Sequence, residues 1–176
     1  MLRRVSLPMI CLALGAACPA ARSAIAAPAA LTTDGDRLSA MQAAYDQAAD
    51  PVAKAKALAK LEPGVFAQAQ ETLDAGNDVE SLQQLEHFRD ETKATVASLA
   101  TVSDHAADHP AGFKELQIAL REAVRQMDTI IVELPVDKHP WFTAVRSDLV
   151  DAQNELIGFL FPKDQRKAAS KSSSPS

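Results

Sequence analysis

The sequence predicts an all-α protein: an antiparallel helical bundle, of about four to six helices with three of them long, that follows an N-terminal leader. Three observations support this. The body of the chain is rich in Ala, Leu, Gln, Glu and Lys, which are good helix formers. Apolar residues recur at intervals of three and four, the spacing that places them on one helix face. Runs of β-branched residues are nearly absent, and only 5% of residues are aromatic, so no segment favours a strand.

The first 26 residues have the layout of a secretory signal peptide. Two arginines supply a positive start, the run 5–21 carries no charge, and Ala24 and Ala26 form an A-x-A cleavage site. The uncharged run is short and proline-containing, whereas a membrane-spanning helix needs about 20 mostly apolar residues. We therefore expect cleavage after Ala26 and export to the periplasm or beyond.

Two features of this leader leave the export route and the final anchoring open. The stretch LGAAC, which ends at Cys18, partly resembles a bacterial lipobox, with Gly15 where a branched apolar residue is usual. Arg3-Arg4 is compatible with the general secretory or the twin-arginine route. Because Cys11 and Cys18 are the two cysteines of the chain, the mature protein would have no disulfide, no thiolate nucleophile and no cysteine metal site.

The rest of the chain divides into three parts. Residues 27–34 read as a flexible spacer, 35–161 as the helical bundle domain, and 162–176 as a basic, Ser-rich tail that we expect to be disordered. Three of the 18 basic residues and none of the 23 acidic residues lie in the leader, so the remainder has a formal charge of −8. This acidic body argues against nucleic-acid binding, which needs a positive surface.

The N-terminal part of the bundle is expected to form a first helix followed by a broken one. The first helix spans about 36–49 and stops before Asp50-Pro51, an N-cap residue followed by a proline suited to a first helical turn. The next helix begins there and meets Pro63, which either kinks or breaks it. Helix then resumes as far as Gly76, which is well placed just beyond a helix end.

Three long helices are expected next, at about 78–106, 111–134 and 141–160. At 1.5 Å per residue the first would be about 43 Å long and the second about 35 Å, so the first should overhang its partner. The first also carries one apolar stripe, with a weak polar step at Thr92. That stripe comprises Leu82, Leu85, Phe88, Thr92, Val96, Leu99 and Val102.

Two His-Pro pairs, at 109–110 and 139–140, raise the question of a repeated site. Proline disfavours the helical conformation in the residue before it, so each histidine sits at a helix boundary. We therefore interpret the pairs as marks of helix starts. The apolar residues after them align at an offset of 29: Phe113, Leu116, Leu120, Ala123 and Met127 with Phe142, Val145, Leu149, Ala152 and Leu156.

The sharpest candidate for chemistry is the stretch DHAADHP at 104–110. If helix persists here, His105 and His109 lie four residues apart on one face and could supply two ligands to Zn²⁺. Asp104 or Asp108 could add a third ligand or orient an imidazole. The alternative is that the helix dipole favours imidazoles near a C-terminus and that Asp108 caps the following helix.

Other signatures are weak or missing. The Glu-x-x-His motif of di-iron bundles, nucleophile elbows, P-loops and dinucleotide fingerprints are absent from the sequence. Met41 and Met127 could ligate a heme, but methionine on an apolar stripe usually packs. Trp141, followed by Phe142, could anchor a partner. The basic tail could contact anionic lipid or cell-wall polymer through Lys163, Arg166, Lys167 and Lys171.

The sequence therefore favours a non-enzymatic envelope protein that binds another protein through a helical face. We predict no catalytic residue, no metal and no cofactor, and membrane contact only if Cys18 is lipidated. The alternative is a metal- or cofactor-binding bundle that uses the region of His105 and His109.

Overall fold

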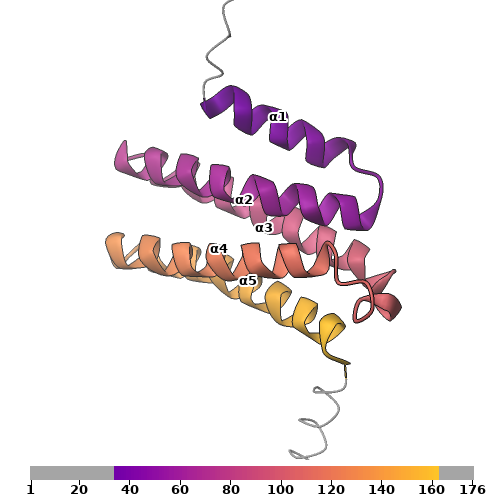
Figure 1. Cartoon of the computed structure of the whole chain (residues 1–176). Coiled ribbons are helices and arrows are strands. Elements are labelled where there is room, and N and C mark those ends of the chain that lie inside the picture. Colours follow the sequence, from indigo (N-terminus) through magenta and orange to yellow (C-terminus); the bar gives the residue numbers. More distant parts are fainter. Residues whose placement is uncertain (1–33, 163–176) are drawn as a thin grey trace, which may run out of the picture. The chain divides into compact units, whose positions relative to one another are not determined.

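The computed structural model describes residues 34–162, and in this part of the chain it contains helices and no strand (Figure 1). The predicted all-α fold class is confirmed. The predicted leader, the spacer except Asp34 and the tail except Pro162 lie outside the described residues. The elements are α1 (Asp34–Gln47), α2 (Pro51–Asp74), α3 (Asp78–Ala100), a 3-10 helix (Ser103–His105), α4 (Phe113–Glu133) and α5 (His139–Leu160).

Both ends of α2 follow from local sequence. Asp50 is extended, and its carboxylate accepts the N–H of Ala53 at 2.7 Å, with Pro51 in the first turn. At the other end Gly76 has a φ of 80°, a conformation that glycine adopts without strain. The N–H groups of Gly76 and of the next residue donate to carbonyls of the last turn at 2.8 and 3.0 Å, which closes the helix.

The expectation of a broken N-terminal pair is wrong, because α2 runs through Pro63 as one helix of 24 residues. The described part of the chain therefore has four long helices rather than three. Proline has no N–H, so the carbonyl of Ala59 lacks its usual helical donor. The helix tolerates this loss because Leu58, Leu61 and Phe66, on either side, are fully anchored in the core.

The end of the next helix also differs from the prediction, because α3 stops at Ala100 rather than about six residues later. The hydroxyl groups of Thr101 and Ser103 donate to backbone carbonyls three residues back, at 2.7 and 2.8 Å. Such bonds compete with the helical ladder. With 23 residues in α3 and 21 in α4, the two helices are about 34 and 32 Å long. The predicted overhang is therefore wrong.

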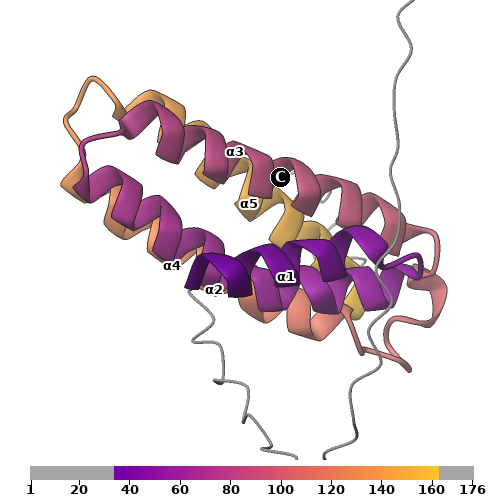
Figure 2. The same ribbon diagram turned by 90° about the horizontal axis from the view of Figure 1, so that it is seen from above.

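The helices form three layers, with α1 on the α2–α3 hairpin and that hairpin on the α4–α5 hairpin (Figures 1 and 2). Consecutive helices are antiparallel, as expected. In contrast, α2 and α4 run parallel, since Glu62 faces Gln126 and Gln70 faces Glu133. The ion pairs that α3 forms with α5 and with Lys138, the residue before α5, show the same parallel direction. The connection at 101–112 therefore carries the chain from one hairpin to the other.

The core lies between the four long helices and confirms the predicted apolar repeat. Two edge-to-face ring pairs, Phe66 with Phe88 and Phe113 with Phe159, lie 5.7 and 6.1 Å apart at their centroids. All ten positions aligned in the sequence are buried: Phe113, Leu116, Leu120, Ala123, Met127, Phe142, Val145, Leu149, Ala152 and Leu156.

None of the helices that the structure describes has the length and apolar character needed to cross a membrane.

The first helix, α1, packs closely on α2 and reaches α3 with the side chains of Gln42 and Tyr45. A Cβ on Gly64 would lie 2.8 Å from the nearest methyl of Leu38, so the absence of a side chain allows this approach. Tyr45 is buried, and its hydroxyl lies 3.2 Å from the carbonyl oxygen of Glu91 and 3.1 Å from Oγ1 of Thr95. These bonds fix α1 to the bundle.

Candidate functional site

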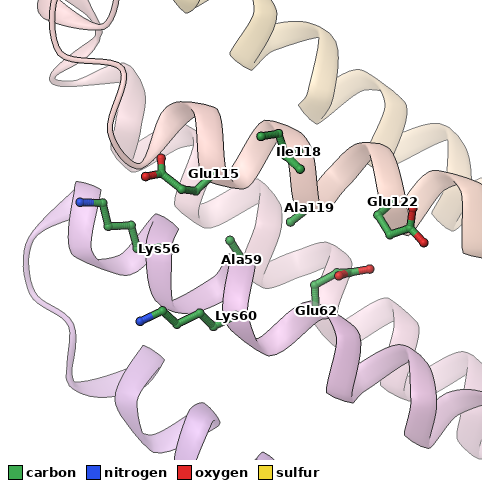
Figure 3. Close-up of a pocket in the computed structure, with 8 residues that line it drawn as sticks. All are labelled: Lys56, Ala59, Lys60, Glu62, Glu115, Ile118, Ala119 and Glu122. Carbon is green, nitrogen blue, oxygen red and sulfur yellow. The ribbon is translucent and has the colours of Figure 1, made fainter.

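An open groove of about 610 Å³ runs between α2 and α4 (Figure 3). The groove is open because the side chains of Ala59 and Ala119 are small, and Ile118 remains 45% exposed within it. The α2 side carries lysines and the α4 side carries glutamates, so the two rims have opposite charge. We call this feature the α2–α4 groove; its lining comprises Lys56, Ala59, Lys60, Glu62, Glu115, Ile118, Ala119 and Glu122.

Glu62 is the unusual residue of the groove, because it is a carboxyl group that is only 2% exposed. The Nε2 group of Gln126 donates to its Oε1 at 2.9 Å. Burial raises the pKa of Glu62 to about 7 because it disfavours the charged form; the negative charge of Glu122 adds to this rise and Arg125 opposes it. Near neutral pH, Glu62 can therefore either hold or release its proton.

The neighbouring ion pair leaves Glu62 without a counter-ion. Nε of Arg125 donates to Oε1 and Oε2 of Glu122 at 3.1 and 3.0 Å, and the same guanidinium reaches Oε1 through a second nitrogen. These bonds lower the pKa of Glu122, which therefore stays charged. In the described residues no cationic side chain lies within ion-pair distance of Glu62.

The opposite end of the groove is fixed by the start of α4. Oε2 of Glu115 accepts the N–H of Gly112 at 2.7 Å, which satisfies one free donor of the helix N-terminus. Gly112 has a φ of 83°, and a Cβ there would lie 2.9 Å from Cγ1 of Val52 on α2. This close approach sets the spacing of the two helices beside the groove.

A second carboxyl group, whose side chain is 10% exposed, lies under α1. Oε1 of Glu91 accepts the amide of Gln42 at 2.5 Å and lies 3.3 Å from Nε2 of His87. Its Oε2 is buried without a hydrogen-bond partner among the described residues, as is Oγ1 of Thr92. Burial raises the pKa of Glu91, and the bond from Gln42 opposes that rise. This cluster is covered by α1 and joins it to α3.

The groove thus contains a buried carboxyl group, and the cluster under α1 contains one that is 10% exposed. No protein-family model, curated protein or solved structure matches this chain. What either place does has to be inferred from its own chemistry. In the cluster, Glu91 is bonded to Gln42 of α1, whereas the groove is open and can admit a ligand.

The structure does not place His105 and His109 on one helix face, so the helical arrangement that the alternative metal site required is not formed. His105 ends the 3-10 helix, and the N–H of His109 donates to its carbonyl at 2.8 Å in a turn outside α3. Both side chains are exposed. Within residues 34–162 no three His, Cys, Asp or Glu side chains form a group that could hold a metal ion.

The His-Pro pairs take two different places beside helix starts. His139 is the first residue of α5 and Pro140 the second, with the imidazole Nε2 2.9 Å from the carbonyl oxygen of Leu134. The other pair, 109–110, lies in the connection ahead of α4, which begins at Phe113. Neither pair lines the α2–α4 groove.

The remaining residues singled out from the sequence lie apart from the groove. Trp141 is 53% exposed at the start of α5, with Nζ of Lys138 5.7 Å from its ring centroid, while Phe142 beside it is core. Met127 is fully buried in the core, and Met41 packs partly buried against it. The basic tail lies outside the described residues.

Sequence reasoning missed Glu62, although the sequence contains a signal for it. The buried face of α2 advances by threes and fours, and a charged residue occupies one of its core positions. Such a residue is buried only with a partner or a function. The series is Ala55, Leu58, Glu62, Phe66 and Ala69.

Proposed function

We propose that this chain is an exported, non-enzymatic protein of the cell envelope that binds a partner protein through the α2–α4 groove. One observation supports this proposal most strongly: an apolar floor, with Ile118 exposed, lies open between two charged rims. An apolar centre with a polar rim is typical of protein interfaces, and helices commonly dock into grooves of this kind.

The charges of the rims indicate how a partner would lie. Lys56 and Lys60 line the α2 side, and Glu115 and Glu122 line the α4 side. An amphipathic helix with an acidic flank against α2 and a basic flank against α4 would match both rims. The parallel α2 and α4 also present two rows of side chains between which a third helix can pack.

Photo-crosslinking in the native cell tests the groove. A photoreactive phenylalanine analogue at Ile118 of the full chain should give one discrete adduct with a partner protein. The control carries the same analogue at Thr143, an exposed position on α5. The groove is not the binding surface if position 118 gives no more adduct than position 143.

Export is tested by the intact mass of the protein purified from its native envelope. We expect a chain that begins at Ala27, or at a lipid-modified Cys18 if the lipobox is used. A chain recovered from the cytosol with residues 1–26 attached would contradict the proposal.

The alternative, a metal- or cofactor-binding bundle, gains no supporting observation from the placement of His105 and His109. Elemental analysis of the natively purified protein tests it directly. A stoichiometric metal that is lost in the His105→Ala/His109→Ala variant would favour this alternative over protein binding.

A further inference from the structure

The groove holds a buried carboxyl group that forms no ion pair among the described residues, although the more distant charge of Arg125 lowers its pKa somewhat. Glu62 is 2% exposed, and the nearby guanidinium of Arg125 is engaged by Glu122. The two lysines of the groove do not serve instead, since Figure 3 shows Lys56 and Lys60 directed away from the Glu62 carboxyl group. A buried charge without a partner is destabilising, so its presence at the wall of an open groove calls for an external partner.

The groove also offers more hydrogen-bond acceptors than donors at this end. Gln126 supplies one donor, to Oε1 of Glu62, and no described residue donates to Oε2. The Glu122 carboxylate, a further acceptor, lines the groove from the facing helix. Figure 3 shows the carboxyl group of Glu62 extending towards the part of α4 that carries Glu122.

We propose that the α2–α4 groove takes a lysine or arginine side chain from an amphipathic helix of the partner, with its cation between Glu62 and Glu122. This inference rests on the proposed function and specifies the chemistry of the partner. Lysine and arginine carry donors and no acceptors, which is what this end of the groove lacks. Their aliphatic stems fit an apolar wall formed by Ala59, Ile118 and Ala119.

The charges make this occupant more favourable than its alternatives. An acidic side chain would meet two carboxyl groups, and an apolar one would leave Oε2 of Glu62 buried and unpaired. A cation gains two charge-assisted contacts without disturbing the bond from Gln126. The basic flank that the α4 rim favours in a partner helix would supply this side chain.

The first experiment uses n-butylguanidinium as a mimic of the arginine side chain. Titrated at pH 8 into the isotopically labelled mature chain, it should give saturable shifts of the Gln126 side-chain amide in NMR spectra. In Glu62→Gln binding should weaken by about tenfold or more, the loss expected when one charge-assisted bond is removed. Glu155→Gln, an exposed acid on α5, is the matched control and should bind as the wild type does.

Either of two NMR results would overturn the inference. One is the absence of any shift of the Gln126 amide, and the other is equal binding by the wild type and the Glu62→Gln variant. Neutral 1-butanol, with the same carbon chain, shows whether apolar contact alone causes the shift, because the inference requires it to bind more weakly than the cation.

Crosslinking at position 118 separates this inference from the proposed function. If the adduct forms equally well in the wild type and in Glu62→Gln, the partner binds without a cation at Glu62 and the inference is wrong. If no adduct forms in any variant, protein binding by the groove is wrong. The expected result is an adduct that Glu62→Gln reduces by about tenfold and Glu155→Gln leaves unchanged. The crosslinked partner peptide should then contain lysine or arginine.

Discussion

Replacing Glu62 by glutamine should stabilise the bundle at neutral and alkaline pH. Glutamine has nearly the same shape, and its carbonyl oxygen can accept the Gln126 amide as the carboxyl oxygen does at 2.9 Å. The substitution removes a buried group that must ionise as the pH rises. It therefore tests the state of this one carboxyl group while the packing around it is kept.

The magnitude follows from the pKa of Glu62, which burial raises from its ordinary value of 4.5 to about 7. The folded state therefore binds this proton more tightly than the unfolded state does. The stabilisation from proton binding is fully present below 4.5 and is lost as the pH rises to about 7. The free energy of unfolding falls by about 1.4 kcal/mol for each pH unit between the two pKa values. Relative to low pH, the loss is therefore roughly 1 kcal/mol at pH 5 and at most about 3 kcal/mol at pH 8.

Urea unfolding followed by circular dichroism at pH 5 and pH 8 measures this cost. The free energy of unfolding of Glu62→Gln, minus that of the wild type, should be larger at pH 8 than at pH 5 by about 2 kcal/mol. The matched control is Glu155→Gln, the same substitution at an exposed position on α5. A difference that is the same at both pH values would refute the reasoning, because Glu62 would then titrate as an ordinary surface carboxyl group.

Three further substitutions test the local structure by urea unfolding. Gly112→Ala should cost about 1–3 kcal/mol more than Gly76→Ala, because both have positive φ but only at Gly112 would a Cβ meet Val52 at 2.9 Å; equal losses would show that this approach is not tight. Asp50→Ala should cost about 1 kcal/mol by removing the cap of α2, and Asp50→Ser should recover most of it. Ser81→Ala should cost about 1 kcal/mol, because its buried hydroxyl donates to a carbonyl of α2 at 2.9 Å; an unchanged free energy would mean that this bond is dispensable.

The sequence predicts α4 and α5 well because their signals are local. Each has an apolar residue at every third or fourth position, and burying that stripe is enough to decide the helix and its inward face. The end of α2 is predicted for the same reason, since Gly76 takes the positive φ that closes a helix.

The features that the sequence did not predict depend on tertiary context. Whether Pro63 breaks a helix depends on how firmly the residues on either side are held, and the buried Leu61 and Phe66 hold them. The end of α3 depends on the hydroxyl groups of Thr101 and Ser103, whose hydrogen bonds to nearby carbonyls compete with those of the helix backbone.

Predicting the groove requires knowing that α2 lies beside α4. The end of α2 and the start of α4 are 39 residues apart in the sequence, so no local pattern indicates this contact. A charged residue at a core position, Glu62, could have drawn attention to one wall of the groove. The facing Glu122 and Gln126 could not be assigned to it without the parallel arrangement of the two helices.

The way in which the two hairpins meet has a mechanical consequence. Because α2 belongs to one hairpin and α4 to the other, any occupant of the groove contacts one helix of each hairpin and links the two hairpins. Pulling the hairpins apart must then break the occupant's contacts as well.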